Sequence, residues 1–327
     1  MNDLLGKDFP RVFKKTLSLD PATLQDIRAG NGLGSRVFSG DICEDPSPIS
    51  PRKSRRASSM REAEEESKAN PMTRGPVWQI NPYNKGGLYH SPGTVTTLMG
   101  TPGIGKTTIA LTELVLNAAK GIKSLYLSLE MNIGYILSKV YKVIDQYGLD
   151  ENVVAANFLL EGSDNFDISS VSTNEVNDYV REYLEQFFIK PNGEFREKGD
   201  KDYIAVVCVD YLQDMILGSI PYVEARLLMT TLVTLSKKAR TSVMVISQVN
   251  RKAASRDSRI LYSSDAASTA AVEHKSHVVI GLHPHNQTVP TGCTDIAFNV
   301  LKNRDSFPII TLMAVDLRRI RILQRLE

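Results

Sequence analysis

The chain has 327 residues, of which 42% are hydrophobic and 23% charged, and its formal net charge is +2 at pH 7. This composition is typical of a globular protein with room for one large or two ordinary domains, and it excludes a polyelectrolyte. No apolar run approaches the length of a membrane span, the polar N-terminus does not resemble a secretory signal, and the three cysteines are far apart. We therefore expect a cytoplasmic protein with no membrane partner, whose nucleic-acid contacts would need a local basic surface.

The N-terminal quarter of the chain differs in composition from the rest. Pro21 and Gly30 bracket a short helical pattern at residues 20–29, so residues 1–40 are predicted to hold a short helical segment. Residues 41–76 combine Ser-Pro pairs, a basic group and an acidic group with few apolar side chains. Such a stretch cannot bury enough apolar surface to offset chain ordering, so we predict a flexible linker followed by a folded domain at residues 77–327.

Residues 100–107 read Gly-Thr-Pro-Gly-Ile-Gly-Lys-Thr and fit the phosphate-binding P-loop pattern. A predicted strand at 94–99 precedes them and a predicted helix at 107–120 follows, as the pattern requires. Glycines let the backbone turn N–H groups toward phosphate oxygens, and the helix adds its positive dipole end. The alternative is a Gly-rich turn that only resembles the pattern.

The P-loop predicts binding of ATP and Mg²⁺. Lys106 can reach the β- and γ-phosphates, and the hydroxyl of Thr107 can ligate the metal. The predicted nucleotide-binding residues are Gly100, Thr101, Pro102, Gly103, Ile104, Gly105, Lys106, Thr107 and Thr108.

Downstream of the P-loop, apolar strand patterns alternate with helical patterns. The predicted strands are 124–129, 203–209, 242–246, 278–282, 295–301 and 309–314, and the predicted helices are 133–147, 172–188 and 223–240. This order indicates an α/β fold with a mainly parallel twisted sheet flanked by helices, and we expect antiparallel strands at its C-terminal end. Ligands would then bind at the carboxyl ends of the parallel strands.

Three of the predicted strands end in a polar residue suited to nucleotide hydrolysis. Asp210 follows four apolar residues and could hold a water of the Mg²⁺ shell. Glu130 is the candidate general base, on a strand that we expect to lie adjacent to the P-loop strand. Gln248 could sense the γ-phosphate and relay its loss. The alternative for each residue is a turn or capping role.

These segments resemble the signatures of DnaB-type replicative helicases. The resemblance rests on residues 128–131 (Ser-Leu-Glu-Met), 210–215 (Asp-Tyr-Leu-Gln-Asp-Met), 247–251 (Ser-Gln-Val-Asn-Arg) and 302–304 (Lys-Asn-Arg), in the family's order and spacing. It covers roughly residues 77–327 and implies the RecA-like P-loop NTPase core of these motors. The first two signatures together are more specific than the P-loop alone.

The resemblance implies a role for each matching residue. Glu130 would be the catalytic base, Lys106 and Thr107 would bind phosphate and Mg²⁺ with help from Asp210, and Gln248 would sense the nucleotide. Lys302 and Arg304 match a basic pair that family members project into the ATP site of a neighbouring subunit, so hydrolysis would require a homohexameric ring. On the sequence alone, these two cations have the simpler interpretation of a solvated strand end.

The resemblance also implies a function, an ATP-driven helicase that translocates on single-stranded DNA during replication, in a compact viral or mobile-element form. We expect a form that lacks the usual N-terminal domain of the family. The sequence also departs from the family in Lys139, where an arginine is common, and in a short, weakly basic segment after Asp210. The DNA-binding candidates that remain are Arg226, Arg251, Lys252, Arg256 and Arg259.

These departures leave a second hypothesis open: a RecA-like regulatory or helicase-loading ATPase that uses ATP as a switch without processive unwinding. A strand-exchange recombinase is a third, less favoured by the Ser-Leu-Glu-Met and Asp-Tyr-Leu-Gln segments. In either of the first two cases, residues 1–75 are the candidate docking segment for a primase, a loader or another replication protein. For a viral protein, the expected location is the host cytoplasm.

Overall fold

The computed structural model describes residues 75–80, 88–162, 172–210, 221–250, 261–266, 269–284, 293–304, 309–317 and 321–324. The chain divides into two compact units, 1–72 and 73–327, and every described residue belongs to the second. The predicted N-terminal helix and nearly all of the predicted linker lie outside the described residues. The same holds for Arg251, Lys252, Arg256 and Arg259.

The described residues form one sheet of nine strands in the order β3-β2-β4-β5-β1-β6-β7-β8-β9. Strands β3 to β6 in this order run parallel, and β6 to β9 pair antiparallel. The predicted fold class is confirmed. The strands are β1 (Val95–Gly100), β2 (Ser124–Ser128), β3 (Phe158–Glu161), β4 (Val206–Asp210), β5 (Ser242–Gln248), β6 (Val278–Pro284), β7 (Thr294–Asn303), β8 (Ile309–Asp316) and β9 (Arg321–Gln324).

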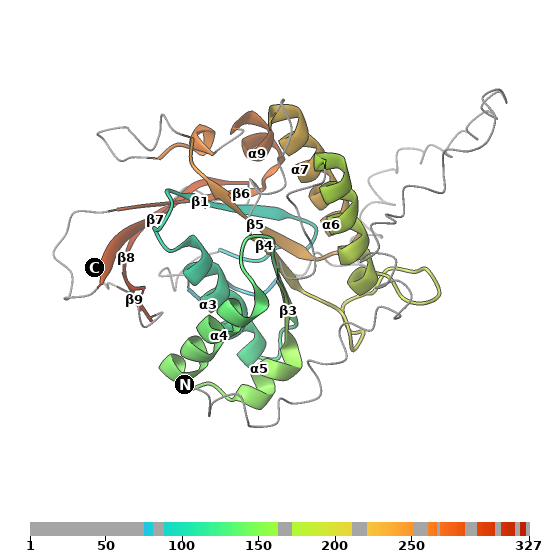
Figure 1. Ribbon diagram of the computed structural model, residues 1–327, viewed down its shortest axis with the longest axis horizontal. Helices are drawn as coiled ribbons and strands as arrows, with labels where there is room; N and C mark the ends of the chain where they lie inside the picture. Colours follow the sequence, from blue (N-terminus) through green and yellow to red (C-terminus); the bar gives the residue numbers. More distant parts are fainter. Residues whose placement is uncertain are drawn as a thin grey trace, which may run out of the picture. The chain divides into compact units, whose positions relative to one another are not determined.

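Helices cover both faces of the sheet (Figure 1). One face carries α3 (Lys106–Ala119), α4 (Ile133–Tyr147) and α5 (Glu151–Asn157), and the other carries α6 (Thr173–Phe188), α7 (Pro221–Ala239) and α9 (Thr269–Lys275). Successive strand residues point to opposite faces, so each buried strand contributes side chains to both hydrophobic cores. In β4, Val206 and Cys208 join the core under α3, whereas Val207 and Val209 join the core under α7.

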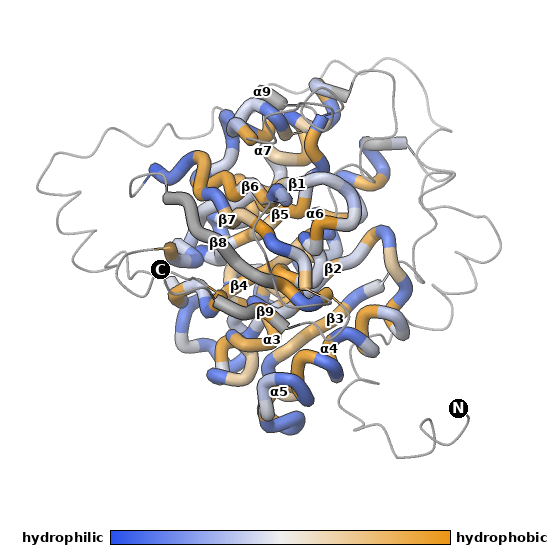
Figure 2. Tube along the Cα trace, turned by 90° about the vertical axis from the view of Figure 1, so that its left-hand side faces the viewer, coloured by the Kyte–Doolittle hydropathy of each residue, from blue (hydrophilic) through white to orange (hydrophobic). Residues whose placement is uncertain are grey.

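The distribution of hydropathy follows from this three-layer arrangement. Figure 2 shows hydrophobic residues concentrated on the central strands and hydrophilic residues along the outer sides of the helices. Among the described residues, no helix is both long and apolar enough to cross a membrane.

Capping residues in the sequence fix where several helices begin and end. The side chain of Asn132 accepts a hydrogen bond from the backbone N–H of Tyr135 at the start of α4, and Gly148 ends that helix in the left-handed conformation. Ser172 and Glu175 form a capping box at the start of α6. These local signals explain why most predicted boundaries agree with the structure to within one or two residues.

Some predicted boundaries were wrong, and some elements were missed. The strand predicted from residue 203 begins at Val206, because the backbone N–H of Tyr203 turns back to donate to Asp200 O at 3.0 Å. The strand predicted to end at residue 246 continues to Gln248, and α7 begins at Pro221, since proline suits the first helical turn. The short elements α5, β3, α9 and β9 were not predicted.

A buried carboxylate joins the segment ahead of β1 to helix α3. Glu113 is fully buried and accepts hydrogen bonds from the backbone N–H groups of Gln79 and Ile80 at 3.0 and 2.9 Å, and from Asn117 Nδ2 at 3.0 Å. Its Oε1 also lies 2.9 Å from Nε2 of His90, on which Trp78 stacks. A buried carboxylate is tolerated because several donors surround it. This cluster therefore fixes residues 75–90, where described, against the helix that carries the P-loop lysine.

We expect Glu113→Ala to lower the free energy of unfolding by about 3–5 kcal/mol, because the substitution leaves several buried donors without an acceptor. Urea unfolding followed by the fluorescence of Trp78, the single tryptophan of the chain, measures this loss. The matched control is Glu182→Ala on the exposed side of α6, which should change stability by less than about 0.5 kcal/mol. Equal effects of the two substitutions would contradict the structural role of Glu113.

Candidate nucleotide-binding site

The P-loop connects the end of β1 to the start of α3, as the sequence predicts. Gly103 and Gly105 have φ angles of 76° and 100°, in the left-handed region that favours glycine. Gly105 is the N-cap of α3, so the unpaired N–H groups of the first helical turn face the loop. A helix N-terminus of this kind binds anions through its N–H groups and its dipole. The side chain of Ile104 packs in the core beneath the loop, so only its backbone is available to a ligand.

Lys106 lies inside the loop that it follows. Its Nζ donates to the carbonyl oxygens of Gly100 at 3.0 Å and Thr101 at 2.9 Å. Burial lowers the pKa of Lys106 to about 8, although the carboxylates of Asp210 and Glu130 act in the opposite direction. A bound polyphosphate would supply the negative charge that restores the protonated amine.

The hydroxyl of Thr107 and the carboxylate of Asp210 meet at the mouth of the loop. Thr107 Oγ1 donates to Asp210 Oδ2 at 2.8 Å, and Tyr126, on β2, donates its hydroxyl to the same oxygen. Burial raises the pKa of Asp210, whereas the hydrogen bonds from Tyr126 and Thr107 act to lower it. Burial also raises the pKa of Tyr126 well above its ordinary value, so this hydroxyl remains a donor.

The order of the strands brings Glu130 and Gln248 to the same edge of the sheet. β2 was expected to lie next to the P-loop strand β1, and that expectation was wrong, because β4 and β5 lie between them. Glu130 still reaches the site, since Ser128 pairs with Asp210 and its Oγ accepts from Met131 N at 3.0 Å, forming the turn that carries Glu130. Gln248 pairs with Gly100, directly beside the loop.

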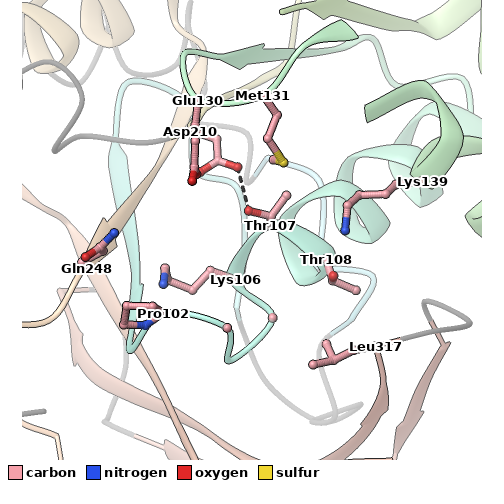
Figure 3. A pocket seen from close by; sticks show the side chains of 12 residues that line it. Pro102, Lys106, Thr107, Thr108, Glu130, Met131, Lys139, Asp210, Gln248 and Leu317 are labelled. Carbon is pink, nitrogen blue, oxygen red and sulfur yellow. Dashed lines mark hydrogen bonds between the residues drawn. The ribbon is translucent and has the colours of Figure 1, made fainter. Parts of the chain in front are cut away.

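These residues line a cavity of about 310 Å³. Figure 3 shows Lys106, Glu130, Asp210 and Gln248 around one side and Thr108, Lys139 and Leu317 around the other. Pro102, Gly103, Gly105, Thr107 and Met131 complete the lining. A cavity of this size and polarity is suited to a small ligand held by a few convergent polar groups.

Sequence reasoning assigned no site role to Tyr126, Met131, Lys139 or Leu317, although Met131 belongs to the Ser-Leu-Glu-Met segment and Lys139 was noted as a departure from the family. Leu317 follows β8 and lies so close to the loop that a Cβ on Gly105 would come within 2.7 Å of its Cδ2. Nothing in the sequence near Leu317 marks this contact. Tyr126 had one signal, a hydroxyl-bearing side chain in an otherwise buried strand, where a partner is required.

Lys302 and Arg304 do not join the cavity. In the register of β6, Gly100 aligns with Leu282, whereas Asn303 pairs with Val278, four steps or about 13 Å back along the strand. The two cations therefore lie at the end of the strands opposite to the end that carries the P-loop. Lys302 Nζ donates to Glu273 O and Arg304 to His274 O, both in α9.

Of the candidate DNA-binding residues, the structure describes Arg226 alone. It is exposed on α7 and is not part of the cavity lining.

Comparison with known proteins identifies the fold and family. A family model described as the DnaB-like helicase C-terminal domain matches residues 85–312. The chain belongs to this family. The DnaB-like domain superposes on a structure titled "ATPase Domain of G40P" with a TM-score of 0.55 and 13% identity, over 83% of this chain and all of that chain.

A second structure, of a DnaB-like replicative helicase and its interactions with primase, gives a TM-score of 0.50 at 14% identity, over 71% of this chain and 57% of that one. Identities this low show the fold alone, which is RecA-like. The DNA repair and recombination protein RadB from two strains of Halobacterium salinarum is 31% identical over 88 residues, or 27% of this chain. The match spans about a third (36%) of the length of these relatives.

The side chains present fit a nucleotide with a magnesium ion. A hydroxyl and a carboxylate lie 2.8 Å apart at the mouth of the loop, and oxygen ligands of this kind are those that Mg²⁺ prefers. The loop N–H groups and Lys106 offer the positive field that a polyphosphate needs. The family is one of nucleoside-triphosphate-hydrolysing domains, which agrees with this donor set.

The low pKa of Lys106 predicts how nucleotide affinity depends on pH. The free protein loses this proton near pH 8, whereas a bound phosphate favours the charged amine, so binding takes up a proton above that pH. We expect the affinity for ADP to be nearly constant from pH 6.5 to 7.5 and to fall about tenfold between pH 8 and 9.5. Isothermal titration calorimetry across this range measures the change.

The control for this prediction is Lys106→Arg, because arginine keeps its charge throughout the range. Its affinity differs from that of the wild type at neutral pH, but the slope above pH 8 should vanish. A wild-type affinity that stays flat up to pH 9.5 would show that Lys106 remains charged in the free protein.

Proposed function

We propose that the protein is an ATP-driven DNA helicase motor that hydrolyses ATP to translocate on single-stranded DNA during replication. The observation that carries this proposal is the convergence of Lys106, Thr107, Asp210, Glu130 and Gln248 on one cavity, from four elements, in a DnaB-like domain. Each of these groups has a distinct part in cleaving a terminal phosphate.

Binding and orientation come from the loop and Lys106. The loop N–H groups hold the phosphate chain, and Lys106 exchanges its carbonyl partners for phosphate oxygens. Thr107 and Asp210 would hold Mg²⁺, and the ion would neutralise charge on the phosphates. The half-buried site keeps these interactions stronger than they would be in water.

Glu130 provides the proton acceptor for hydrolysis. It accepts a proton from the water that attacks the γ-phosphorus, while the bond from that phosphorus to the bridging oxygen breaks to release ADP and phosphate. Gln248 would respond to the loss of the γ-phosphate through its side-chain amide. This role is supported by its position at the end of β5, between the P-loop strand and the strand of Asp210.

A homohexameric ring would complete the site. Arg304 lies at the end of the strands opposite to the cavity of its own subunit. It would therefore stabilise the transition state in the site of a neighbouring subunit. Single-stranded DNA would pass through the ring, gripped at its phosphates by Arg226 and the basic segment at 251–259. Residues 1–75 would contact a primase, a loader or another replication protein, and the motor would act in the cytoplasm of the cell or of a viral host.

The direct test measures DNA-stimulated ATP hydrolysis and displacement of a forked duplex. Glu130→Gln should lower the turnover number about 10²–10⁴-fold, because it removes the proton acceptor without changing the shape of the site. Lys106→Ala should abolish both activities, and Arg181→Ala on the exposed face of α6 is the control that should leave them intact. Hydrolysis by the wild type without strand displacement would instead favour a regulatory or helicase-loading ATPase.

A mixing experiment tests whether Arg304 acts in a neighbouring subunit. Arg304→Ala alone should reduce turnover by about 10³-fold or more, as expected for a cation that stabilises phosphoryl transfer. In an equimolar mixture of Arg304→Ala and Lys106→Ala subunits, about a quarter of the interfaces combine an intact loop with an intact Arg304, so activity should reappear. A mixture as inactive as its components would show that Arg304 does not act across the interface.

A further inference from the structure

Tyr126 places a hydroxyl group in a part of the core that is otherwise apolar. Its side chain is fully buried on β2, in the same cluster as Cys208, Met244 and Ile109 beneath α3. The ring starts opposite Cys208 in the register of β2 and β4, and the hydroxyl reaches Asp210, two residues further along β4. A buried hydroxyl is costly without a partner, so this bond fixes both side chains in place.

Both hydroxyl donors of Asp210 contact the same carboxylate oxygen. Thr107 and Tyr126 donate to Oδ2, and among the described residues no hydrogen bond goes to Oδ1. Asp210 lines the cavity, so Oδ1 is the oxygen left for a cation or its bound water. The two donors thus occupy Oδ2 and leave Oδ1 as the oxygen that can face the ligand.

The two donors differ in what else they can do. Thr107 lines the cavity and is the hydroxyl that would ligate Mg²⁺ through an oxygen lone pair, while its proton can still be donated to Asp210. Tyr126 does not line the cavity, so we do not expect it to contact the metal. Tyr126 therefore orients the carboxylate from outside the cavity lining, whereas Thr107 contacts both the carboxylate and the proposed ligand site.

We propose that Tyr126 is a positioning residue for the metal site, holding Asp210 in its metal-binding orientation from outside the cavity lining. This inference rests on the proposed nucleotide and Mg²⁺ site and deepens it. Tyr126 acts through Asp210, so its removal affects the contribution of the metal to nucleotide binding and leaves the metal-independent contribution of the loop and Lys106 unchanged.

The test compares the ADP dissociation constant of the full-length protein in Mg²⁺ and in EDTA, by calorimetry, for the wild type and Tyr126→Phe. The ratio of the two constants is the metal's contribution. It should fall about tenfold in Tyr126→Phe, as for loss of one hydrogen bond to a charged group, while affinity in EDTA changes less than about twofold. An unchanged ratio in Tyr126→Phe overturns the proposal, and so does a wild-type affinity that does not respond to Mg²⁺.

The chain offers a matched control in Tyr183. Its hydroxyl also donates to a largely buried carboxylate, Glu161 Oε2, at 2.9 Å, and neither residue lines the cavity. Tyr183→Phe therefore removes the same kind of bond in the core on the other face of the sheet, outside the cavity lining. Its metal ratio should equal that of the wild type, and an equal fall in both variants would show a general loss of rigidity instead.

A second measurement serves if Tyr126→Phe does not fold. Incorporation of 3-fluorotyrosine at position 126 keeps the ring and the hydroxyl, and its ¹⁹F resonance should shift when Mg²⁺ is added to the ADP-saturated protein. The same label at position 183 should give an unshifted resonance. An unshifted signal at 126 overturns the proposal.

These outcomes are distinct from failure of the proposed function. A wild type that binds Mg²⁺ and ADP but neither hydrolyses ATP nor displaces a strand refutes the motor and leaves the role of Tyr126 standing.

Discussion

The candidate site depends on the hydrogen bond from Thr107 to Asp210. These two residues are 103 positions apart in the chain, and their bond joins α3 to β4. Asp210 ends a central strand and is 1% exposed, so its carboxylate would be costly to bury without donors. Thr107 can donate because α3 crosses the sheet above β4, and this places the P-loop at the carboxyl edge of the same sheet. The packing of α3 on β4, which includes this hydrogen bond, therefore positions the loop, the lysine and the oxygens proposed to bind the metal together.

The parts of this site that could be predicted from the sequence are those with local signals. The loop is identified by its glycines, and Asp210, Glu130 and Gln248 by their places at the ends of apolar runs. Strand order is a non-local property, which explains why Glu130 was expected on a neighbour of β1 and is instead two strands further away. Tyr126 and Leu317 escaped for the same reason, since their contacts are made with residues distant in sequence.

Short elements were missed for a different physical reason. α5 and β3 have seven and four residues, too few for a periodic pattern to distinguish helix from strand, and they are stabilised by packing on longer elements. The buried Glu113 cluster is also invisible in the sequence, because a glutamate within a helical pattern normally lies on the solvated face. Its partners come from the segment ahead of β1, where no repeat or motif announces them.

Lys302 and Arg304 were given the same predicted role on the basis of the sequence, but their environments in the structure differ. Both donate to carbonyl oxygens in the last turn of α9, where the helix dipole favours positive charge. Lys302 is half-buried, and burial lowers its pKa, so it is held in place and is poorly suited to reach outward. Arg304 is exposed, and losing its hydrogen bond to His274 O costs only about 1 kcal/mol. A charge-assisted hydrogen bond to a phosphate would be stronger than the bond that is lost. Of the two, Arg304 is therefore better suited to the proposed contact with a neighbouring subunit.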